Sequence, residues 1–389
     1  RVKVNHIFLY QSTNGRASKY MKKINLSLEL ILLLTSFLLI ITYNFKFPLD
    51  ADVHFVIKSG EEIWQTGSFP VYDVFSWVPV NLKVPYINVE WLSCLILYLV
   101  YHTGGFLSVT IYKTFLYGVS YFILFPFLKN KYGSLPSLLA IIIAIYTGRL
   151  FLSPRAMIYS AIFFPIITYM LLLDRKTFFN KKQFLYFFII FLLWINFHGG
   201  FFVGLVYLYT GFVINYFCKI QNMEYKKKKE LLLYYLLLMA VCLIATLITP
   251  YGPGMLLKTF VYFTPQSIRI FIQGNTEYQS PLSFVKIFQD YFLVLLSGSG
   301  FLLFYFFKFR LKPSAMEIYS FIFFMLISLQ AVRNIQLFSV AIIPAFSFII
   351  SSTFNLAKES KFFKQEIFFK PELHYIFLLL KIVSLYLIL

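Results

Sequence analysis

The stretch NLSLELILLLTSFLLIITYNF, residues 25–45, decides the fold class of this chain. It carries one charged residue, Glu29, and as a helix it would be about 31 Å long, which matches the ~30 Å hydrocarbon core of a bilayer. Ten further apolar runs follow it: 106–128, 135–148, 156–173, 183–197, 200–218, 231–249, 290–307, 314–331, 333–353 and 373–389. The pattern predicts an all-α integral membrane protein with about 11 transmembrane helices.

The composition supports this class and excludes others. Of the 389 residues, 59% are hydrophobic and only 13% are charged, whereas soluble domains have about 25% charged residues. A soluble enzyme, a secreted disulfide scaffold and a disordered chain are therefore excluded. The three cysteines lie in apolar segments without a Cys-x-x-Cys pair, so no zinc site or disulfide framework is indicated. The net charge of +19 is scattered between apolar runs, which argues against nucleic acid as a partner.

The basic residues predict the topology. If the short apolar segment 91–101 does not cross, one side of the membrane carries 24 Lys and Arg and the other carries 9. The positive-inside rule then places the N-terminus in the cytoplasm. As a helix, 91–101 reaches only about 17 Å, so we expect an interfacial helix. Two long loops, 46–105 and 250–289, fall outside, and the first should hold another helix over 53–66 that ends at Gly67.

The chain reads as a single transmembrane domain over 21–389. A Met-Lys-Lys start at Met21 marks residues 1–20 as an expected upstream or non-native extension. The last apolar run continues to Leu389, so we also expect that a C-terminal part is missing.

Unusual polar residues gather on the predicted external side. Ionisable groups at a membrane boundary are costly and are often functional. The clusters are Asp50-Ala51-Asp52-Val53-His54, Tyr72-Asp73, Asn88-Val89-Glu90-Trp91, Ser153-Pro154-Arg155, Asn196-Phe197-His198-Gly199-Gly200, Thr249–Gly252, Thr276–Pro281 and Arg333-Asn334. Each has a bland alternative, such as an interfacial acid, a turn-capping His or a stray exposed charge.

These residue types suit glycosyl transfer from a lipid-phosphate donor. A carboxylate at the membrane surface can accept the proton of an attacking group, and arginines can pair with the departing phosphate. A divalent cation held by Asp50 and Asp52 is a further option, since carboxylates and phosphate oxygens are its usual ligands. An anion transporter would use the same arginines, although transporter sites usually lie near mid-membrane.

The first loop, DADVHFVIKSGEEIWQTGSFPVYDVFSW followed by NVEWLSCLILYLVYHTGG, resembles that of bacterial membrane glycosyltransferases of the GT-C superfamily. Further matches follow in family order: WINFHGGFFVGL (194–205), TPYG (249–252), EYQSP (277–281) and RNIQLF (333–338). Together they cover residues 50 to about 345. Relatives of this kind include protein O-mannosyltransferases and lipid A aminoarabinose transferases.

The resemblance implies a GT-C-like bundle and a hexosyl- or pentosyltransferase that uses a polyprenyl-phosphate sugar on the extracytoplasmic face of the plasma membrane. It assigns the catalytic base to Asp52 and a supporting or metal-binding role to Asp50. It places substrate-binding residues at His54, Glu90, Arg155, His198, Glu277 and Arg333, and phosphate binding by the two arginines is our inference. The acceptor would be a glycan, a lipid or a protein.

The sequence also departs from the family. His54 is displaced, Val89 stands where relatives often have His, and Asn334 replaces another frequent His. A changed substrate or a degenerate, inactive member therefore stays open, and much of this branch has no known substrate. Two other functions also stay open: a transporter or flippase for a lipid-linked or anionic substrate, and a polymerase or ligase of surface polysaccharide.

Overall fold

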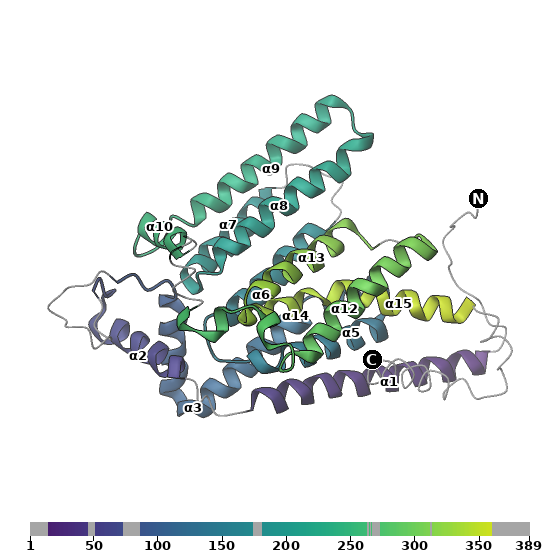
Figure 1. Ribbon diagram of the computed structural model, residues 1–389, viewed down its shortest axis with the longest axis horizontal. Coiled ribbons are helices and arrows are strands. Elements are labelled where there is room, and N and C mark those ends of the chain that lie inside the picture. The colour runs from purple at the N-terminus through teal and green to yellow at the C-terminus, as the bar shows by residue number, and fades with distance from the viewer. Residues whose placement is uncertain are drawn as a thin grey trace.

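The computed structural model describes residues 15–45, 51–72, 86–173, 181–262, 264, 266, 273–311 and 313–359. In these ranges every extended regular element is a helix (Figure 1). The prediction of an all-α protein is therefore confirmed for the part of the chain that is described. Asp50 and the run 373–389 lie outside it.

The predicted apolar runs that the structure describes coincide with helices. The matching elements are α1 (Gly15–Asn44), the second part of α3 (Trp91–Phe122) with α4 (Phe125–Tyr132), α5 (Ser134–Gly148), α6 (Met157–Leu172), α7 (Lys181–Phe197), α8 (Phe201–Lys219), α9 (Tyr225–Ala245), α12 (Gln289–Phe304) continued by η6 (Tyr305–Phe309), α13 (Ala315–Gln330), and α14 (Ile335–Ala341) with α15 (Ile343–Glu359). α1 begins inside the predicted extension, at Gly15.

Fewer helices than eleven meet a strict criterion for crossing a membrane. Among the described residues, five are long and apolar enough, or six if the pair Val332–Ala341 and Ile343–Leu356, bent by 49°, is one span. The runs at 156–173 and 314–331 form apolar helices of 16 residues each, which are shorter than the usual span. These helices indicate a membrane-associated protein.

Both short helices expected in the first loop are present. α2 (Ala51–Thr66) ends where the Gly67 N–H donates to the Ile63 carbonyl at 3.1 Å, and Gly67 has the left-handed φ of +61° that glycine tolerates. The predicted helix at 91–101 forms the first part of α3. It is separated from the rest by non-helical angles at Gly104 and Gly105. The Gly-Gly pair therefore divides this stretch into two helical parts, and whether the first part lies at the membrane interface stays a prediction.

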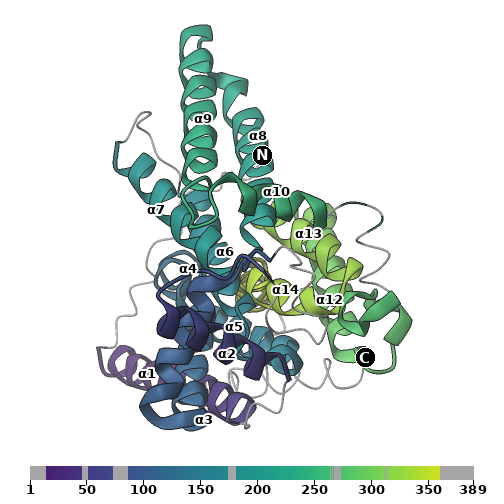
Figure 2. The same cartoon turned by 90° about the vertical axis from the view of Figure 1, so that its left-hand side faces the viewer.

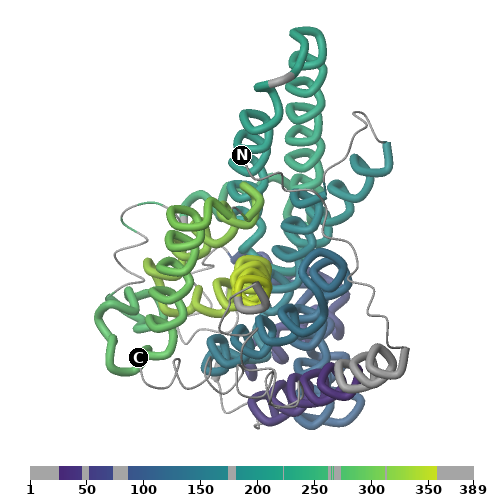
Figure 3. Tube along the Cα trace, turned by 90° about the vertical axis from the view of Figure 1, so that its right-hand side faces the viewer, coloured from purple at the N-terminus to yellow at the C-terminus, as the bar shows by residue number. Residues whose placement is uncertain are grey.

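The core centres on the last described helices. From Ile335 to Ile350 nearly every residue of α14 and α15 is buried, including Phe338 and Ile342 at 0% exposure. Figure 3 shows α15 (yellow) almost end-on in the middle of the bundle, and it packs on α5, which in turn packs on α1. A helix that is apolar all round is expected at such a position.

One end of the molecule collects the short helices. In Figure 1, α2, the start of α3 and α10 (Pro253–Tyr262) lie together at the left, and Figure 2 faces that end. The turn between α7 and α8 points to the same end, while α8 and α9 extend away from it. Glu90, His198 and the segment Thr249–Gly252 lie in these connections, before α3, between α7 and α8 and before α10.

Gly60 allows the close approach of α2 to α3, and we expect its replacement by alanine to be destabilising. A Cβ at Gly60 would lie 2.0 Å from the Cys94 carbonyl oxygen, which is a clash with backbone. Overpacking of this kind costs about 1–3 kcal/mol. The matched control is Gly300→Ala, where a Cβ meets nothing within 4 Å. Thermal unfolding in detergent should show a lower midpoint for Gly60→Ala alone, and equal midpoints would contradict the prediction.

Candidate functional site

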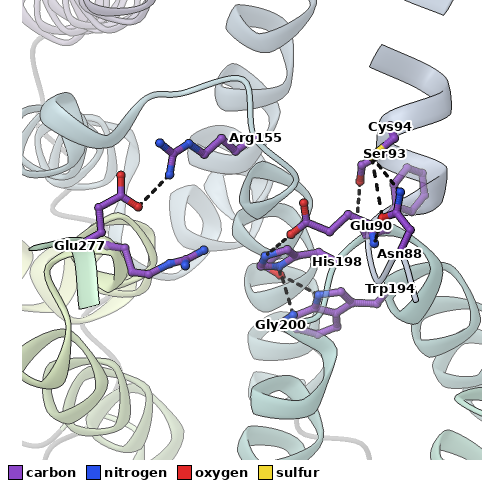
Figure 4. A network of polar contacts seen from close by, with 12 residues as sticks. Asn88, Glu90, Ser93, Cys94, Arg155, Trp194, His198, Gly200 and Glu277 are labelled. Atoms are coloured by element: carbon purple, nitrogen blue, oxygen red, sulfur yellow. Dashed lines mark hydrogen bonds and ion pairs between the residues drawn. The ribbon is translucent and has the colours of Figure 1, made fainter. Parts of the chain in front are cut away.

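Charged side chains from distant parts of the chain converge at this end of the bundle. Arg155, in the connection before α6, lies 3.2 Å from Asp52 Oδ2 through Nη2 and 2.7 Å from Glu277 Oε2 through Nη1. Asp52 belongs to the first turn of α2, and Glu277 to η4 (Thr276–Tyr278). One guanidinium therefore joins two carboxylates that are far apart in sequence (Figure 4 shows Arg155 and Glu277).

A buried tyrosine, Tyr117, binds the backbone of the connection that carries Arg155. The Tyr117 hydroxyl donates to the carbonyl of Ser153 at 3.0 Å and is 3.2 Å from that of Phe151. Tyr117 is only 1% exposed. Because a buried hydroxyl needs a partner, this contact restricts where the backbone before Arg155 can lie.

Arg333 lies where the segment 276–281 contacts the segment 332–334. It lies in η7 (Val332–Asn334), donates a hydrogen bond to the Tyr278 hydroxyl, and its guanidinium carbon is 4.8 Å from the centre of the Tyr278 ring. The neighbouring Val332 N–H donates to the Gln279 carbonyl at 2.9 Å. The segments EYQSP and RNIQLF are therefore bound to each other.

Arg155, Arg333 and Glu277 line one cavity of about 150 Å³. This is far above the ~10–15 Å³ that one water molecule needs. The rest of its wall is Tyr117, Leu150, Phe151, Ser153, Met157 and Gln336. Its polar wall carries two cations and one anion, while Leu150, 57% exposed, belongs to its apolar wall. A negatively charged group with an apolar extension fits such a lining.

His198 and Glu90 form a second pair beside this cluster. His198 lies in the turn between α7 and α8, Glu90 is the residue before α3, and His198 Nε2 is 3.5 Å from Glu90 Oε1. On the other side of the ring, Ser160 Oγ is 2.6 Å from His198 Nδ1 and accepts a hydrogen bond from Trp194 Nε1 at 2.8 Å. The Gly200 N–H also points at Nδ1, at 3.2 Å. Figure 4 shows this chain of contacts.

The environment shifts both groups of the pair. Burial lowers the pKa of His198 to about 3, and the nearby positive charge of Arg333 adds to the effect. Burial raises the pKa of Glu90 to about 7, although Arg333 and Arg155 act in the opposite direction. The imidazole is therefore neutral near pH 7, and Glu90 gains or loses its proton in the physiological range.

Two of the sequence clusters meet directly around this pair. Trp91 Nε1 donates to Asn196 Oδ1 at 2.8 Å, and Ser93 Oγ donates to the Phe197 carbonyl. Asn88 Oδ1 accepts from the Glu90 N–H at 2.9 Å, which fixes the turn that carries Glu90. The segments NVEW and NFHGG thus build one unit.

Other predicted residues are not brought into the cluster, or they lie outside the described residues. His54 is exposed, with its ring edge-on to Phe106 at 5.2 Å. Asp50 is not described, so its proposed role stays a prediction. In the described residues no three His, Cys, Asp or Glu side chains form a group that could hold a metal ion, and Asp52 faces the cation of Arg155.

Several residues of the site were not predicted from the sequence: Tyr117, Ser160, Trp194, Tyr278 and Gln336. Ser160 lies inside an apolar run, and nothing in its neighbourhood distinguishes it from any other small residue of a helix. Tyr278 and Trp194 do lie within the quoted segments EYQSP and WINFHGG. Their place in these two segments is the feature of the sequence that could have identified them. No protein-family model matches the sequence, and no curated protein is significantly similar to it.

Proposed function

We propose that this chain is a membrane glycosyltransferase that moves a sugar from a polyprenyl-phosphate donor to an acceptor on the extracytoplasmic face of the plasma membrane. The observation that carries the proposal is the pairing of Arg155 and Arg333 in one cavity at the ends of the helices. The GT-C-like bundle of eleven spans, with a cytoplasmic N-terminus, belongs to the same proposal. It is supported by the helices found at the predicted runs and by the asymmetry of Lys and Arg.

The chemistry needs a cationic site for the leaving group. When the bond between the sugar and the phosphate breaks, negative charge grows on the phosphate oxygen, and a guanidinium stabilises it by a charge-assisted hydrogen bond. Arg155 and Arg333 supply two such groups on one wall. Glu277 keeps Arg155 oriented before a donor arrives.

The donor also needs room for its lipid chain. Leu150, Phe151 and Met157 form the apolar part of the cavity wall, and Leu150 is largely exposed at its edge. An isoprenoid chain could leave the cavity over this edge and lie against the apolar outer surface of the bundle. An anion without a lipid chain would make no favourable contact with these apolar side chains.

A proton acceptor completes the reaction. Asp52 and Glu90 both interact with Arg155, so two carboxylates lie near the proposed phosphate position. The resemblance to GT-C enzymes assigns the task of base to Asp52. His54 stays a proposed substrate-binding residue, although it is exposed and does not line the cavity. A divalent cation held by Asp50 and Asp52 stays a prediction, because Asp50 lies outside the described residues.

The proposal is tested with the purified protein in nanodiscs and a panel of undecaprenyl-phosphate hexoses and pentoses. We expect release of undecaprenyl phosphate from one donor class, accelerated by an extract that contains the acceptor, and competition by free undecaprenyl phosphate. Boiled protein is the control. Flux of a lipid-linked sugar into proteoliposomes without a glycosidic product would instead show a transporter or flippase. A ladder of products would show a polymerase.

A further inference from the structure

The contacts of His198 determine where its proton lies. An indole N–H can only donate, so the Ser160 hydroxyl oxygen accepts from Trp194 and its own hydrogen is free to point at His198 Nδ1. The Gly200 N–H points at the same nitrogen. Nδ1 therefore carries a lone pair, and the proton of the neutral ring is on Nε2. This N–H faces Glu90 Oε1.

The backbone at Gly200 lies close against the hydroxyl of Ser160 and the ring of His198. A Cβ at Gly200 would lie 2.5 Å from Ser160 Oγ and 2.7 Å from His198 Nδ1. Trp194 is fully buried among Phe163, Phe164 and Phe191. The indole, the hydroxyl and the imidazole therefore form a rigid support whose outer end is the Nε2–H group.

Glu90 is the group that this support holds. Three charged groups lie near it: Arg155 from the connection before α6, Arg333 from η7, and Asp52 from α2. The titratable groups Tyr86 and Cys94 are also close to it. In Figure 4 the Glu90 side chain extends from α3 toward His198, on the side where Arg155 and Glu277 lie.

We propose that Glu90, rather than Asp52, is the catalytic proton acceptor of this site, and that His198 is its positioning residue, locked as the Nε2–H tautomer by Ser160 and Trp194. This inference rests on the proposed glycosyl transfer. An acceptor O–H attacks the anomeric carbon, and a new C–O bond forms while the bond to the phosphate oxygen breaks. The electron pair leaves with the phosphate, beside Arg155 and Arg333. The acceptor's proton moves to a Glu90 oxygen.

Geometry separates the two carboxylates. Asp52 faces the guanidinium of Arg155, and its side chain is 61% exposed. A carboxylate in that position orients the arginine and is surrounded by water. Glu90 is 31% exposed and faces a neutral donor that can stabilise either of its protonation states. A group whose pKa lies near the working pH is the more effective general base, and the value for Glu90 is about 7.

The first experiment compares Glu90→Gln with Asp52→Asn, using the undecaprenyl-phosphate sugar that the wild type cleaves. Wild-type kcat should rise as the pH increases through about 7, because the ionised form of Glu90 is the active one. Glu90→Gln should lose about 10²–10⁴-fold in kcat and lose this pH dependence. Asp52→Asn should keep the pH profile and raise KM. The opposite result, with the profile lost in Asp52→Asn and kept in Glu90→Gln, overturns the proposal.

The second experiment tests the support. Ser160→Ala removes the hydroxyl that fixes the tautomer, so kcat should fall about tenfold or more with KM unchanged and the pH midpoint shifted. Thr168→Val is the matched control, since Thr168 is also a buried hydroxyl of α6 and its partner is Tyr207, away from the site. Equal kinetics in the two variants would overturn the role of His198 as a positioning residue.

Failure of this inference can be distinguished from failure of the proposed function. Infrared spectroscopy follows the protonated carboxyl band without any substrate, and wild type should lose a band near neutral pH that Glu90→Gln lacks. Binding of undecaprenyl phosphate is measured on the same samples. Binding without the Glu90 band overturns the role of Glu90 alone, whereas the band without binding overturns the transferase.

Discussion

Replacement of Arg155 by alanine should weaken the binding of undecaprenyl phosphate by about 30- to 150-fold. The guanidinium contacts both Asp52 and Glu277 and also lines the cavity. Truncating one partner of a buried charge pair costs about 2–5 kcal/mol. We use the lower part of that range, about 2–3 kcal/mol, because the side chain is 25% exposed. Tritiated undecaprenyl phosphate in a nanodisc binding assay gives the measurement.

The matched control for this variant lies on the same connection. Arg149 pairs with Asp290 and stacks on Tyr146 at 3.8 Å, yet it does not line the cavity. Arg149→Ala should therefore leave the affinity unchanged. Arg155→Lys should restore only part of it, since an ammonium cannot pair with two groups in the planar manner of a guanidinium. If Arg155→Ala lost thermal stability as strongly as it lost affinity, the arginine would be structural.

A large loss of stability is expected for Glu317→Ala, at about 2–3 kcal/mol, which is below the range for a fully buried pair because Lys131 is 35% exposed. Glu317 is fully buried at the start of α13. Its carboxylate accepts from Lys131 Nζ at 2.9 Å and from the Tyr132 hydroxyl at 2.6 Å, and its other oxygen accepts from the Ser314 N–H at 2.8 Å. Alanine would leave a lysine, a buried hydroxyl and the start of a helix without their partner.

Thermal or denaturant unfolding in detergent measures this effect. Glu224→Ala is the matched control, because its pair with Lys227 is exposed on both sides and such pairs contribute about 0–1 kcal/mol. Glu317→Gln should fall between the two, since the amide oxygen can still accept one hydrogen bond. A Glu317→Ala protein as stable as Glu224→Ala would show that the buried network contributes nothing.

The sequence predicted the helices well because each depends on nearby residues. An apolar run of sufficient length must form a helix to satisfy its backbone in lipid, and Gly67 ended α2 as expected. The number of membrane spans was harder to predict, because the runs at 156–173 and 314–331 give helices of 16 residues. Their length alone does not decide whether they cross.

The charged residues of the site could be predicted from the sequence, whereas the uncharged residues that contact them could not. Arg155, Glu277 and Arg333 stood out because they lie in polar clusters on the predicted external side, which carries few Lys and Arg. Ser160 of α6 contacts His198 and accepts a hydrogen bond from Trp194 of α7, and such contacts between helices are set by packing that no local pattern encodes. The same holds for Tyr117, whose hydroxyl reaches a loop more than thirty residues later in the chain.

The buried pair α14 and α15 has a consequence for biogenesis. These are the last described helices to leave the ribosome, yet they occupy the middle of the bundle. The inner faces of the helices that are synthesised earlier must therefore contact lipid or the insertion machinery until α14 and α15 are inserted. A ribosome stalled before residue 332 would leave a bundle without this central segment, and its cavity would lack Arg333.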